Sequence, residues 1–535
     1  MLSNHQSSGE HSAWLVYGLL FVIVVGALAI RFRLRDMPLE RDEGEYAYAG
    51  QLLLQGAGPY QHLYSVKLPG TYAVYALVLA TLGQSAAAIH IGLALANTVA
   101  IVCLFFISRK LWDDWAAIVA AATYALLSLG APVNGLAAHA TLFVVLFAML
   151  GTWMLLAATD SPKPILLFCT GVLFGLAFLM KQPGLLFFLW ALGYYVYQRR
   201  RSNSAHALPS DIAVLIGSAV LPFVITCLLM AATGEFGKFW FWTFTYVRHY
   251  GTEVPLADGL ALLGLQGWQI VRVAPLLWVI ALVGLSAAAW NARARVTGFF
   301  TTSLLVASFI ATSAGLYFRP HYFILLLPAV SLLAGVAVAC ATAKLPPILR
   351  PLPALVFAIA VAHALYLQRE VLFRMSPIEA CDQIYPHQPF AAAVEVATYI
   401  RAHTSEHDTI AVLGSEPEIY FYAHRRAATD YVYMYPLLKP QAYSDQAQSE
   451  MIREVEVARP AMLVFVNVPA SWIASAHTEA NPELLRWARN YIAANYVADG
   501  VAEFDTSPQY IWGEQAAHYS VHSPFNMLVF RRKQP

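Results

Sequence analysis

Three carboxylates lie within four residues of one another near the beginning of the chain: Asp42, Glu43 and Glu45. They follow an apolar run, and carboxylates at a membrane boundary can act as a general base or bind a divalent ion. Gly44 would let the chain turn sharply between them. The helical spacing of apolar residues from Tyr46 onward predicts a short amphipathic helix. Because acidic residues also favour helix starts, the cluster fits both a catalytic site and a solvated helix N-terminus.

Basic residues at the ends of other apolar runs could hold an anion. Lys67 precedes the apolar run 69–83, where its ammonium can pair with a phosphate or simply extend to the lipid headgroups. Lys181 lies between two apolar runs and fits an interfacial anchor as well as a ligand site. Arg248 follows the aromatic stretch 239–242, which could line a groove for a sugar or a lipid tail, or form an interfacial aromatic belt.

The composition indicates which elements must position these residues. Of 535 residues, 59% are hydrophobic and 12% are charged, and the mean hydropathy is +0.56. A soluble domain carries about 25% charged residues. A soluble protein of this size would lack the polar surface to cover its core, so the composition predicts a polytopic membrane protein. The formal net charge of +1 excludes a strongly basic nucleic-acid-binding protein.

Hydropathy predicts about eleven transmembrane helices. The first apolar run, 13–30, is preceded by no Lys or Arg and followed by three arginines, so we interpret it as a retained helix rather than a signal peptide. A polar and aromatic segment, 31–84, follows as a large first loop, and its run 69–83 is short enough to be an interfacial helix. The other expected spans are 85–107, 114–131, 139–157, 164–180, 184–198, 211–232, 274–290, 298–317, 322–342 and 352–368.

The arginine cluster 199–201 decides the expected orientation, because short cytoplasmic loops carry an excess of basic residues. With this cluster inside, the segment 31–84 and the C-terminal region face the extracytoplasmic side. Counting spans places Lys67, Lys181, Arg248 and Arg319 on that same side. The positive charges are otherwise nearly balanced, and the long, mixed-charge, aromatic loops of the outer side support it as the working face.

From about residue 370 the composition changes and most acidic residues appear. Strand patterns at 409–413 and 461–466 alternate with helix patterns at 390–403 and 483–495, which predicts a small α/β domain with a partly parallel sheet. We therefore expect a transmembrane domain, 1–369, and an extracytoplasmic α/β domain, 370–535. Glu416 and Glu418, next to the first strand, could contact the acceptor, but a solvated turn is the more common setting for such residues and is the one expected here.

Several stretches together resemble one family. The first loop contains Asp42-Glu43-Gly44-Glu45-Tyr46, Leu52-Leu53, Gly56, Pro59-Tyr60 and Lys67-Leu68-Pro69. Later come Lys181-Gln182-Pro183-Gly184, Arg319-Pro320-His321-Tyr322 with Pro328, and Gly414-Ser415-Glu416-Pro417-Glu418-Ile419-Tyr420. In this order they resemble the C-class membrane glycosyltransferases of the family 39 type, which include dolichyl-phosphate-mannose protein mannosyltransferases, lipid A aminoarabinose transferases and lipopolysaccharide galacturonosyl transferases.

The resemblance implies a mechanism. Such enzymes take a sugar from a polyprenyl-phosphate donor on the outer face and usually invert its anomeric centre. The residue matching the base is Asp42, with Glu43 beside it for the acceptor or for positioning. The donor phosphate would be held by Lys67, with Arg319 and His321 as candidates for the second cation. Further candidate substrate-binding residues are Glu45, Tyr46, Tyr60, His139, Lys181, Arg248 and Tyr322.

One departure from the family concerns metal binding. Many relatives carry an acidic residue near the start of the fourth helix, where this chain has Thr141. A metal site with two carboxylates is therefore in doubt, although a divalent metal remains possible and no cofactor is certain. His139, nearby, could be a ligand or a base. A lone histidine at a helix start is more often a local hydrogen-bonding residue.

Two other functions fit a chain of this kind. A flippase or transporter for a lipid-linked saccharide should show charges within its membrane segments and symmetric halves, whereas here the charges cluster at helix ends. A degenerate relative that binds but no longer transfers is kept open by Thr141. The expected protein is thus a multi-pass enzyme of the inner membrane with an extracytoplasmic site. Its partners are membrane lipids, the lipid-linked sugar and a glycan, lipid or protein acceptor, with no nucleic acid.

Overall fold

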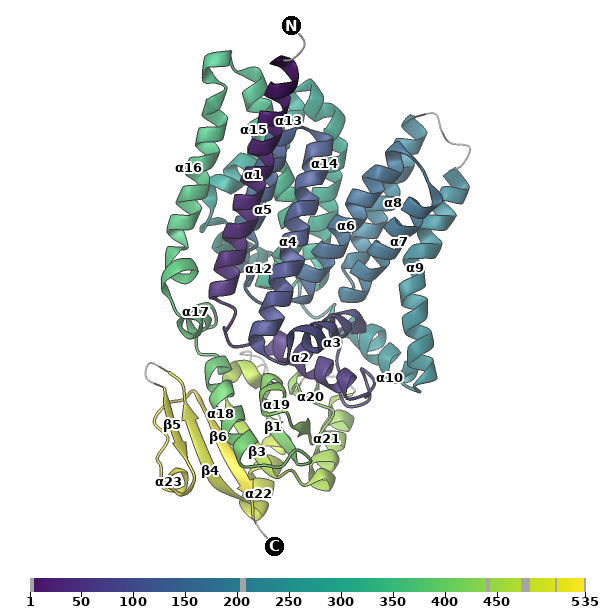
Figure 1. Cartoon of the computed structure of the whole chain (residues 1–535). Helices are drawn as coiled ribbons and strands as arrows, with labels where there is room; N and C mark the ends of the chain where they lie inside the picture. Colours follow the sequence, from purple (N-terminus) through teal and green to yellow (C-terminus); the bar gives the residue numbers. More distant parts are fainter. Residues whose placement is uncertain (1–3, 203–207, 439–442, 473–481, 506–507, 534–535) are drawn as a thin grey trace.

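The computed structural model describes residues 4–202, 208–438, 443–472, 482–505 and 508–533. A bundle of long helices forms one part of the molecule, and a smaller domain with a sheet lies at one end of it (Figure 1). We call this smaller domain, from residue 377 onward, the outer domain because of its place beyond the end of the bundle. The bundle helices are α1 (Asn4–Arg33), α4 (Ala86–Leu111), α5 (Asp114–Leu127), α6 (Ala140–Asp160), α7 (Pro164–Met180), α8 (Gly184–Arg201), α9 (Leu208–Ala232), α13 (Pro275–Trp290), α14 (Ala292–Thr312), α15 (Leu327–Lys344) and α16 (Pro351–Leu367).

Each apolar run that the sequence analysis expected to span the membrane overlaps one of these helices, although 114–131 and 298–317 extend beyond α5 and α14, and 322–342 begins before α15. Among the described residues, seven helices are long and apolar enough to cross a membrane, or up to eight if a bent pair forms one span. Helices α5 and α7 are apolar but shorter. The chain is therefore a polytopic helical membrane protein, while the number of eleven crossings remains a prediction.

One helix of the bundle region was not expected. Residues placed in a long loop by the sequence analysis form α12 (Leu256–Val271), and α12 meets α13 at an angle of 110°. Short helical turns complete this half of the chain. They are η1 (Ala131–Val133), α10 (Phe236–Trp240), the π-helical turn η3 (Phe241–Tyr246), α11 (Val247–Tyr250), η4 (Ala314–Leu316), η5 (Pro320–Leu325), η6 (Pro347–Leu349) and η7 (Glu370–Arg374).

Two short helices lie across the end of the bundle, α2 (Arg41–Leu54) and α3 (Pro69–Leu82) (Figure 1). A capping box fixes the start of α2, because the Glu40 carboxylate accepts the Glu43 N–H and the Glu43 carboxylate accepts the Glu40 N–H. Pro69 occupies the first turn of α3, where its missing N–H costs no hydrogen bond. These caps hold the carboxylate cluster at the end of the bundle.

Helix α2 does not lie at a surface with one polar face exposed, as an amphipathic helix would, because residues 43–52 are all buried. The bundle covers one face and the outer domain covers the other (Figure 1). Gly44 lies inside this helix rather than in a turn. A Cβ atom at Gly44 would lie 2.5 Å from the backbone nitrogen of Glu418, so glycine is needed there for close packing against the outer domain. The expected role of Gly44 in a turn is therefore wrong.

The outer domain is built on a six-stranded sheet of strand order β2-β1-β3-β6-β4-β5. Strand β1 (Thr409–Leu413) runs parallel to β2 (Arg426–Ala427) and β3 (Met462–Asn467), with Ile410 opposite Met462 and Leu413 opposite Phe465. The pairs of β3 with β6 (Asn526–Arg532), of β6 with β4 (Tyr496–Glu503) and of β4 with β5 (Gln509–Trp512) are antiparallel. The sheet is thus partly parallel, as predicted.

Helices surround this sheet and connect it to the bundle. They are α17 (Pro377–Ile384), α18 (Phe390–Ala402), α19 (Glu418–Ala423), α20 (Tyr435–Leu438), α21 (Ser444–Ala458), η8 (Pro469–Trp472), α22 (Pro482–Asn495) and α23 (Glu514–Ala517). Helix α19 packs on α2. Glu416 and Glu418, at the start of α19, are both 0% exposed, so the expectation of a solvated turn is wrong. They lie instead at the interface between the two parts of the molecule.

Candidate active site

A cavity of about 170 Å³ opens where the first loop meets the ends of the bundle helices. Three of its lining residues are cationic: Lys67 from the α2–α3 loop, Lys181 from the α7–α8 turn and Arg319 just before η5. We call it the cationic cavity. Its other lining residues are Asp42, Val66, Thr141, Gln182, Pro183, Val247, Gly251, Ala311, Ala314, Gly315, Tyr317, His321, Tyr322 and Leu325.

The Asp42 carboxylate has different neighbours on its two oxygens. Lys67 Nζ donates to Asp42 Oδ1 at 2.9 Å, and it lies 3.3 Å from the hydroxyl of Tyr46. Asp42 Oδ2 lies 3.8 Å from Nδ1 of His139. One oxygen is thus held by an ammonium, whereas the other faces an imidazole.

These contacts set the charge of the carboxylate. Burial alone would raise the pKa of Asp42, but the Lys67 ammonium, helped by the surrounding basic residues, holds it well below its usual range. Burial likewise works against the charge of Lys67, yet Asp42 keeps the pKa of Lys67 well above its ordinary value. The two groups therefore form an ion pair at neutral pH.

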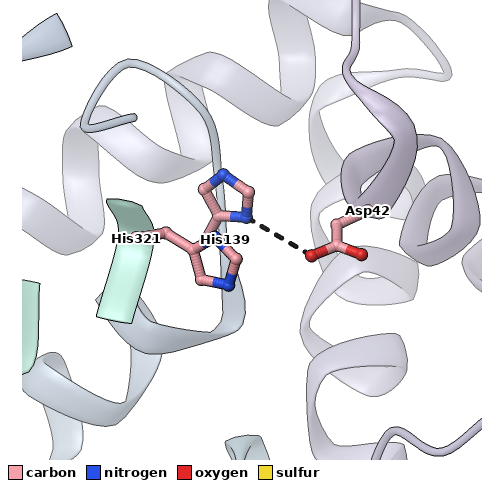
Figure 2. A group of neighbouring side chains, drawn as sticks. All are labelled: Asp42, His139 and His321. Carbon is pink, nitrogen blue, oxygen red and sulfur yellow. Dashed lines mark ion pairs between the residues drawn. The ribbon is translucent and has the colours of Figure 1, made fainter. Parts of the chain in front are cut away.

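Two histidines lie opposite Asp42, and one of them, His321, lines the cationic cavity. The rings of His139 and His321 stack with centroids 4.1 Å apart and planes at 12° (Figure 2). Neither ring nitrogen of His139 has a hydrogen-bond partner, and burial lowers the pKa of His139 to about 4. The imidazole is therefore neutral and has an uncommitted lone pair. His139 is thus not the local hydrogen-bonding residue that is commonest at helix starts.

A metal ion would fit the donor set of Asp42, His139 and His321. One ligand atom from each residue lies within 4.8 Å of the others. Neutral imidazoles with one carboxylate suit zinc and similar transition metals rather than magnesium, which prefers oxygen ligands. Thr141 lies on the cavity wall but brings no second carboxylate. When bound, such an ion would act as a Lewis acid on a phosphate oxygen.

Lys181 provides a second ammonium in the cationic cavity. Its Nζ lies 3.4 Å from Nε2 of His321 and 4.1 Å from the ring centroid of Tyr322. Burial, followed by the charge of Lys67, lowers the pKa of Lys181 to about 7. An anionic ligand bound beside Lys181 would favour its charged form, which is the behaviour expected of an anion-binding site. The cavity thus brings together Lys67, Lys181 and Arg319, which the span count had placed only on the same side of the membrane.

A second cavity, of about 80 Å³, adjoins the first at the Asp42–Lys67 pair. Asp42, Val66, Lys67 and Arg319 line both cavities. Its walls carry aromatic rings from the first loop, η3 and the outer domain, and we call it the aromatic cavity. The remaining lining residues are Glu45, Tyr64, Ser65, Trp242, Tyr246, Tyr433, Tyr435 and Pro436.

The other two carboxylates of the cluster do not share the position of Asp42. Glu43 is 0% exposed and lines neither cavity. Its Oε1 accepts the Ala138 N–H at 2.6 Å and lies 3.1 Å from His90 Nε2, so it fastens α2 to the bundle. Glu45 lines the aromatic cavity, where its Oε1 accepts the hydroxyls of Ser65 and, at 2.6 Å, Tyr72.

Among the other residues singled out from the sequence, two support Lys67. Tyr60 is 0% exposed, and its hydroxyl donates to the Lys67 carbonyl at 2.6 Å. Tyr46 reaches the Lys67 ammonium. Tyr60 therefore positions the loop without lining either cavity. Arg248 is exposed and lines neither cavity, although its neighbour Val247 does.

The outer domain contributes residues that the sequence analysis missed. The Tyr433 hydroxyl donates to the Arg41 carbonyl at 3.1 Å and lies 3.4 Å from Asp42 Oδ1. Arg41 in turn pairs with the buried Glu416 at 2.7 Å and donates to the Ser415 carbonyl at 2.6 Å. The only sequence signal for these contacts was the density of tyrosines at 431–435. Pairing across nearly 400 residues gives no local pattern.

Comparisons with known proteins show which proteins this chain is similar to. Residues 67–229 match the model of the family described as dolichyl-phosphate-mannose-protein mannosyltransferase. The chain is 27% identical over 292 residues to undecaprenyl phosphate-alpha-4-amino-4-deoxy-L-arabinose arabinosyl transferase 2 of Pseudomonas fluorescens. This match spans 51% of the chain and about half, 48%, of that relative's length.

Solved structures show the same fold at low identity. The apo structure of ArnT from Cupriavidus metallidurans has a TM-score of 0.57 at 15% identity, over 96% of this chain and 98% of that one. Its structure with undecaprenyl phosphate has a TM-score of 0.53 at 18% identity, over 86% and 94%. The oligosaccharyltransferase AglB from Archaeoglobus fulgidus has a TM-score of 0.51 at 14% identity, over 94% and 75%. The resemblance to C-class membrane glycosyltransferases is confirmed.

Proposed function

From this kinship with the C-class membrane glycosyltransferases, we propose that the protein transfers a sugar from a polyprenyl-phosphate donor to an acceptor hydroxyl. One observation carries the proposal: Asp42 lies where a cationic cavity and an aromatic cavity meet. A base between an anion-binding site and a second substrate pocket is what such a transfer requires. The ArnT structure bound to undecaprenyl phosphate supports the class of donor.

In the proposed reaction the donor phosphate lies in the cationic cavity, held by Lys67, Lys181 and Arg319. The acceptor hydroxyl lies in the aromatic cavity and gives its proton to the Asp42 carboxylate. The acceptor oxygen bonds to the anomeric carbon as the bond from that carbon to the phosphate oxygen breaks, and the polyprenyl phosphate leaves. A single displacement of this kind inverts the anomeric centre. The phosphate leaves without protonation because the three cations stabilise its charge.

The ion pair of Asp42 and Lys67 suits an ordered reaction. While Lys67 holds Asp42 Oδ1 at 2.9 Å, the carboxylate is a weak base because its pKa is low. A donor phosphate would compete for the Lys67 ammonium. Its arrival would weaken the pair and raise the pKa of Asp42, so that the carboxylate becomes a better base once the donor is present.

A lipid-linked saccharide transporter is the second candidate. Transporters place their ionisable groups at the midplane of the membrane. Here the cationic residues gather instead at the end of the bundle, beside the outer domain. The carboxylate between two cavities favours an enzyme over a carrier, and it also favours an active enzyme over a relative that only binds.

The deciding experiment compares the envelope glycans and lipids of cells that lack the protein with those of cells complemented by wild type or by Asp42→Asn. We expect the deletion to remove one sugar from one acceptor, wild type to restore it, and the variant to be inserted in the membrane without restoring it. Full restoration by Asp42→Asn would refute a catalytic role for this carboxylate. A donor that accumulates in the membrane of the deletion strain would identify the sugar.

We further propose that the site is extracytoplasmic in the inner membrane. Cysteines introduced at positions 62 and 445 should then react with an impermeant reagent in intact spheroplasts. A control cysteine at position 200, in the arginine cluster, should react only after permeabilisation. Labelling of position 62 or 445 only after permeabilisation would overturn this orientation.

A further inference from the structure

A third cavity, of about 260 Å³, lies outside the site described above, between η3 and helix α21 of the outer domain. We call it the outer cavity. Aromatic rings form most of its wall, and polar groups lie among them. Its lining residues are Tyr64, Gly237, Lys238, Phe241, Trp242, Tyr431, Tyr443, Gln446, Ala447 and Glu450.

The outer cavity and the aromatic cavity share two residues, Tyr64 and Trp242. The two rings stack with centroids 5.3 Å apart and planes at 22°. The two cavities therefore lie on either side of one aromatic pair. Beyond the pair, Asp42 lines the aromatic cavity. A molecule that fills both cavities would thus extend from the outer domain to the proposed base.

The outer cavity is less basic than the cationic cavity, because its lining carries one carboxylate, Glu450, and one ammonium, Lys238. Glu450 accepts a hydrogen bond from the Tyr431 hydroxyl at 3.0 Å, and Asp430 and Glu454 lie directly behind the wall. Lys238 is the cation among these groups, and it lies 3.6 Å from Asp430. A phosphate or another anionic headgroup is disfavoured beside the Glu450 carboxylate, with Glu454 near it and a single ammonium to offset their charges. An acyl chain would displace water from the Glu450 carboxylate and offer no hydrogen bond in exchange.

A sugar ring matches this wall. Its C–H faces pack on aromatic rings, and its hydroxyls can donate to the Glu450 carboxylate and bond to the amide of Gln446. Ligand pockets commonly combine an aromatic lining with a few polar groups in this way. Phe241 and Tyr443 stand edge to face with centroids 5.0 Å apart, one from the bundle side and one from the outer domain. Both parts of the molecule thus contribute to the same wall.

We propose that the outer cavity binds a saccharide unit of the acceptor, adjacent to the unit whose hydroxyl reaches Asp42. The acceptor is then an oligosaccharide, rather than a protein side chain or a lone lipid. This inference rests on the proposed function, because it takes the aromatic cavity as the place of the reacting hydroxyl. It adds the acceptor class and a site remote from the reacting atoms.

The test uses the full chain in lipid nanodiscs, on an immobilised panel of oligosaccharides from bacterial lipopolysaccharides, capsules and peptidoglycan, with the matching monosaccharides. Phe241→Ala and Tyr443→Ala remove one ring each from the outer cavity. Trp240→Ala is the matched control, because Trp240 precedes Phe241, is 45% exposed and lines none of the three cavities. Phe241→Leu keeps packing volume if the alanine variant does not fold. Binding of undecaprenyl phosphate is measured in parallel.

We expect wild type and Trp240→Ala to retain at least one oligosaccharide, and the two outer-cavity variants to bind it about tenfold more weakly, as is typical for loss of an aromatic anchor. Monosaccharides should bind weakly to all variants, and undecaprenyl phosphate should bind equally to all.

Two results would overturn the inference while leaving the proposed function intact. One is that wild type binds undecaprenyl phosphate but no oligosaccharide of the panel. The other is that oligosaccharide binding is the same in Phe241→Ala and Tyr443→Ala as in Trp240→Ala, with only a lower melting temperature. Failure of wild type to bind undecaprenyl phosphate would instead count against the proposed function itself.

Discussion

The cationic cavity and the aromatic cavity meet at the same carboxylate, but only the aromatic cavity takes part of its wall from the outer domain. Lys67, Lys181 and Arg319, which line the first, all belong to turns between helices of the membrane part. The second takes Tyr433 and Tyr435 from the outer domain. The membrane part thus supplies the groups that suit an anionic lipid-linked donor, and the outer domain supplies part of the wall that suits an uncharged acceptor.

The contrast also shows that the outer domain is part of the site. Arg41 and Gly44 on α2 are both fixed by residues at the start of α19, the first through Glu416 and the second by close packing against Glu418. Asp42 lies between these two contacts. Its position therefore depends on the docking of a domain more than 300 residues away in sequence.

The largest effect is expected at the carboxylate that both cavities share. Asp42→Asn keeps the shape of the side chain and removes the base, which typically lowers the rate by about 10²- to 10⁴-fold. Glu43→Gln is the matched control: it removes a neighbouring charge that lines neither cavity, so it should lower the melting temperature and cost less activity. Transfer by the purified variants measures both. Wild-type rates in Asp42→Asn, or equal losses at both positions, would contradict this assignment.

The next largest effect is expected on donor binding, and it tests whether a lysine of the cationic cavity matters more than a lysine elsewhere. Lys67→Ala should weaken binding of undecaprenyl phosphate by about 1.5–3 kcal/mol, the worth of a hydrogen bond to a charged group. Lys67→Arg should recover part of it. Lys238→Ala removes a lysine outside this cavity and should leave binding unchanged. Unaltered binding in Lys67→Ala, measured by titration in nanodiscs, would mean that Lys67 only pairs with Asp42 or extends to lipid headgroups.

A smaller effect tests whether the outer domain must dock closely on α2. In Gly44→Ala the new Cβ would lie 2.5 Å from the backbone of Glu418, and overpacking of this kind costs about 1–3 kcal/mol. We expect a lower melting temperature and faster proteolysis between the two parts. Gly193→Ala in α8 meets nothing within 4 Å and should be neutral or stabilising. A Gly44→Ala protein as stable as wild type would show that α19 is free to move.

The smallest effect is expected on the pH dependence of stability, through Asp430 near the outer cavity. Burial and the neighbouring Glu454 raise the pKa of Asp430 to about 7, against the opposing charge of Lys238. The folded protein thus keeps a proton that the unfolded chain loses near pH 4, so the free energy of unfolding falls as the pH rises from about 4 to about 7.

The side chain of the Asp430→Asn variant cannot ionise, so the variant should lose this pH dependence of the free energy of unfolding. The difference from wild type should be about 1 kcal/mol or less after solvent screening. Melting temperatures at pH 5 and pH 8 measure the difference between variant and wild type. Asp445→Asn, at an exposed position in the first turn of α21, serves as the control. A difference that does not change with pH would contradict an elevated pKa at Asp430.

The sequence by itself determined the features that depend on local composition and spacing. The apolar runs form helices, and the lengths of the continuous hydrophobic segments suffice to predict them. The alternation of strand and helix patterns after residue 370 predicted the mixed sheet. The acidic cluster and the basic residues at helix ends marked the region of the site, and the resemblance to a glycosyltransferase family rested on these same residues.

Only the tertiary structure decided which of these residues share one cavity and which are buried supports. Three neighbouring acids have three roles, because Asp42 faces Lys67, Glu43 faces His90 and Glu45 faces Tyr72. From the sequence we expected Glu416 and Glu418 at the surface, because most acidic residues are exposed. Both are buried where α19 meets α2. Such outcomes depend on partners far away in the sequence, whose side chains determine local burial and charge and leave no local pattern.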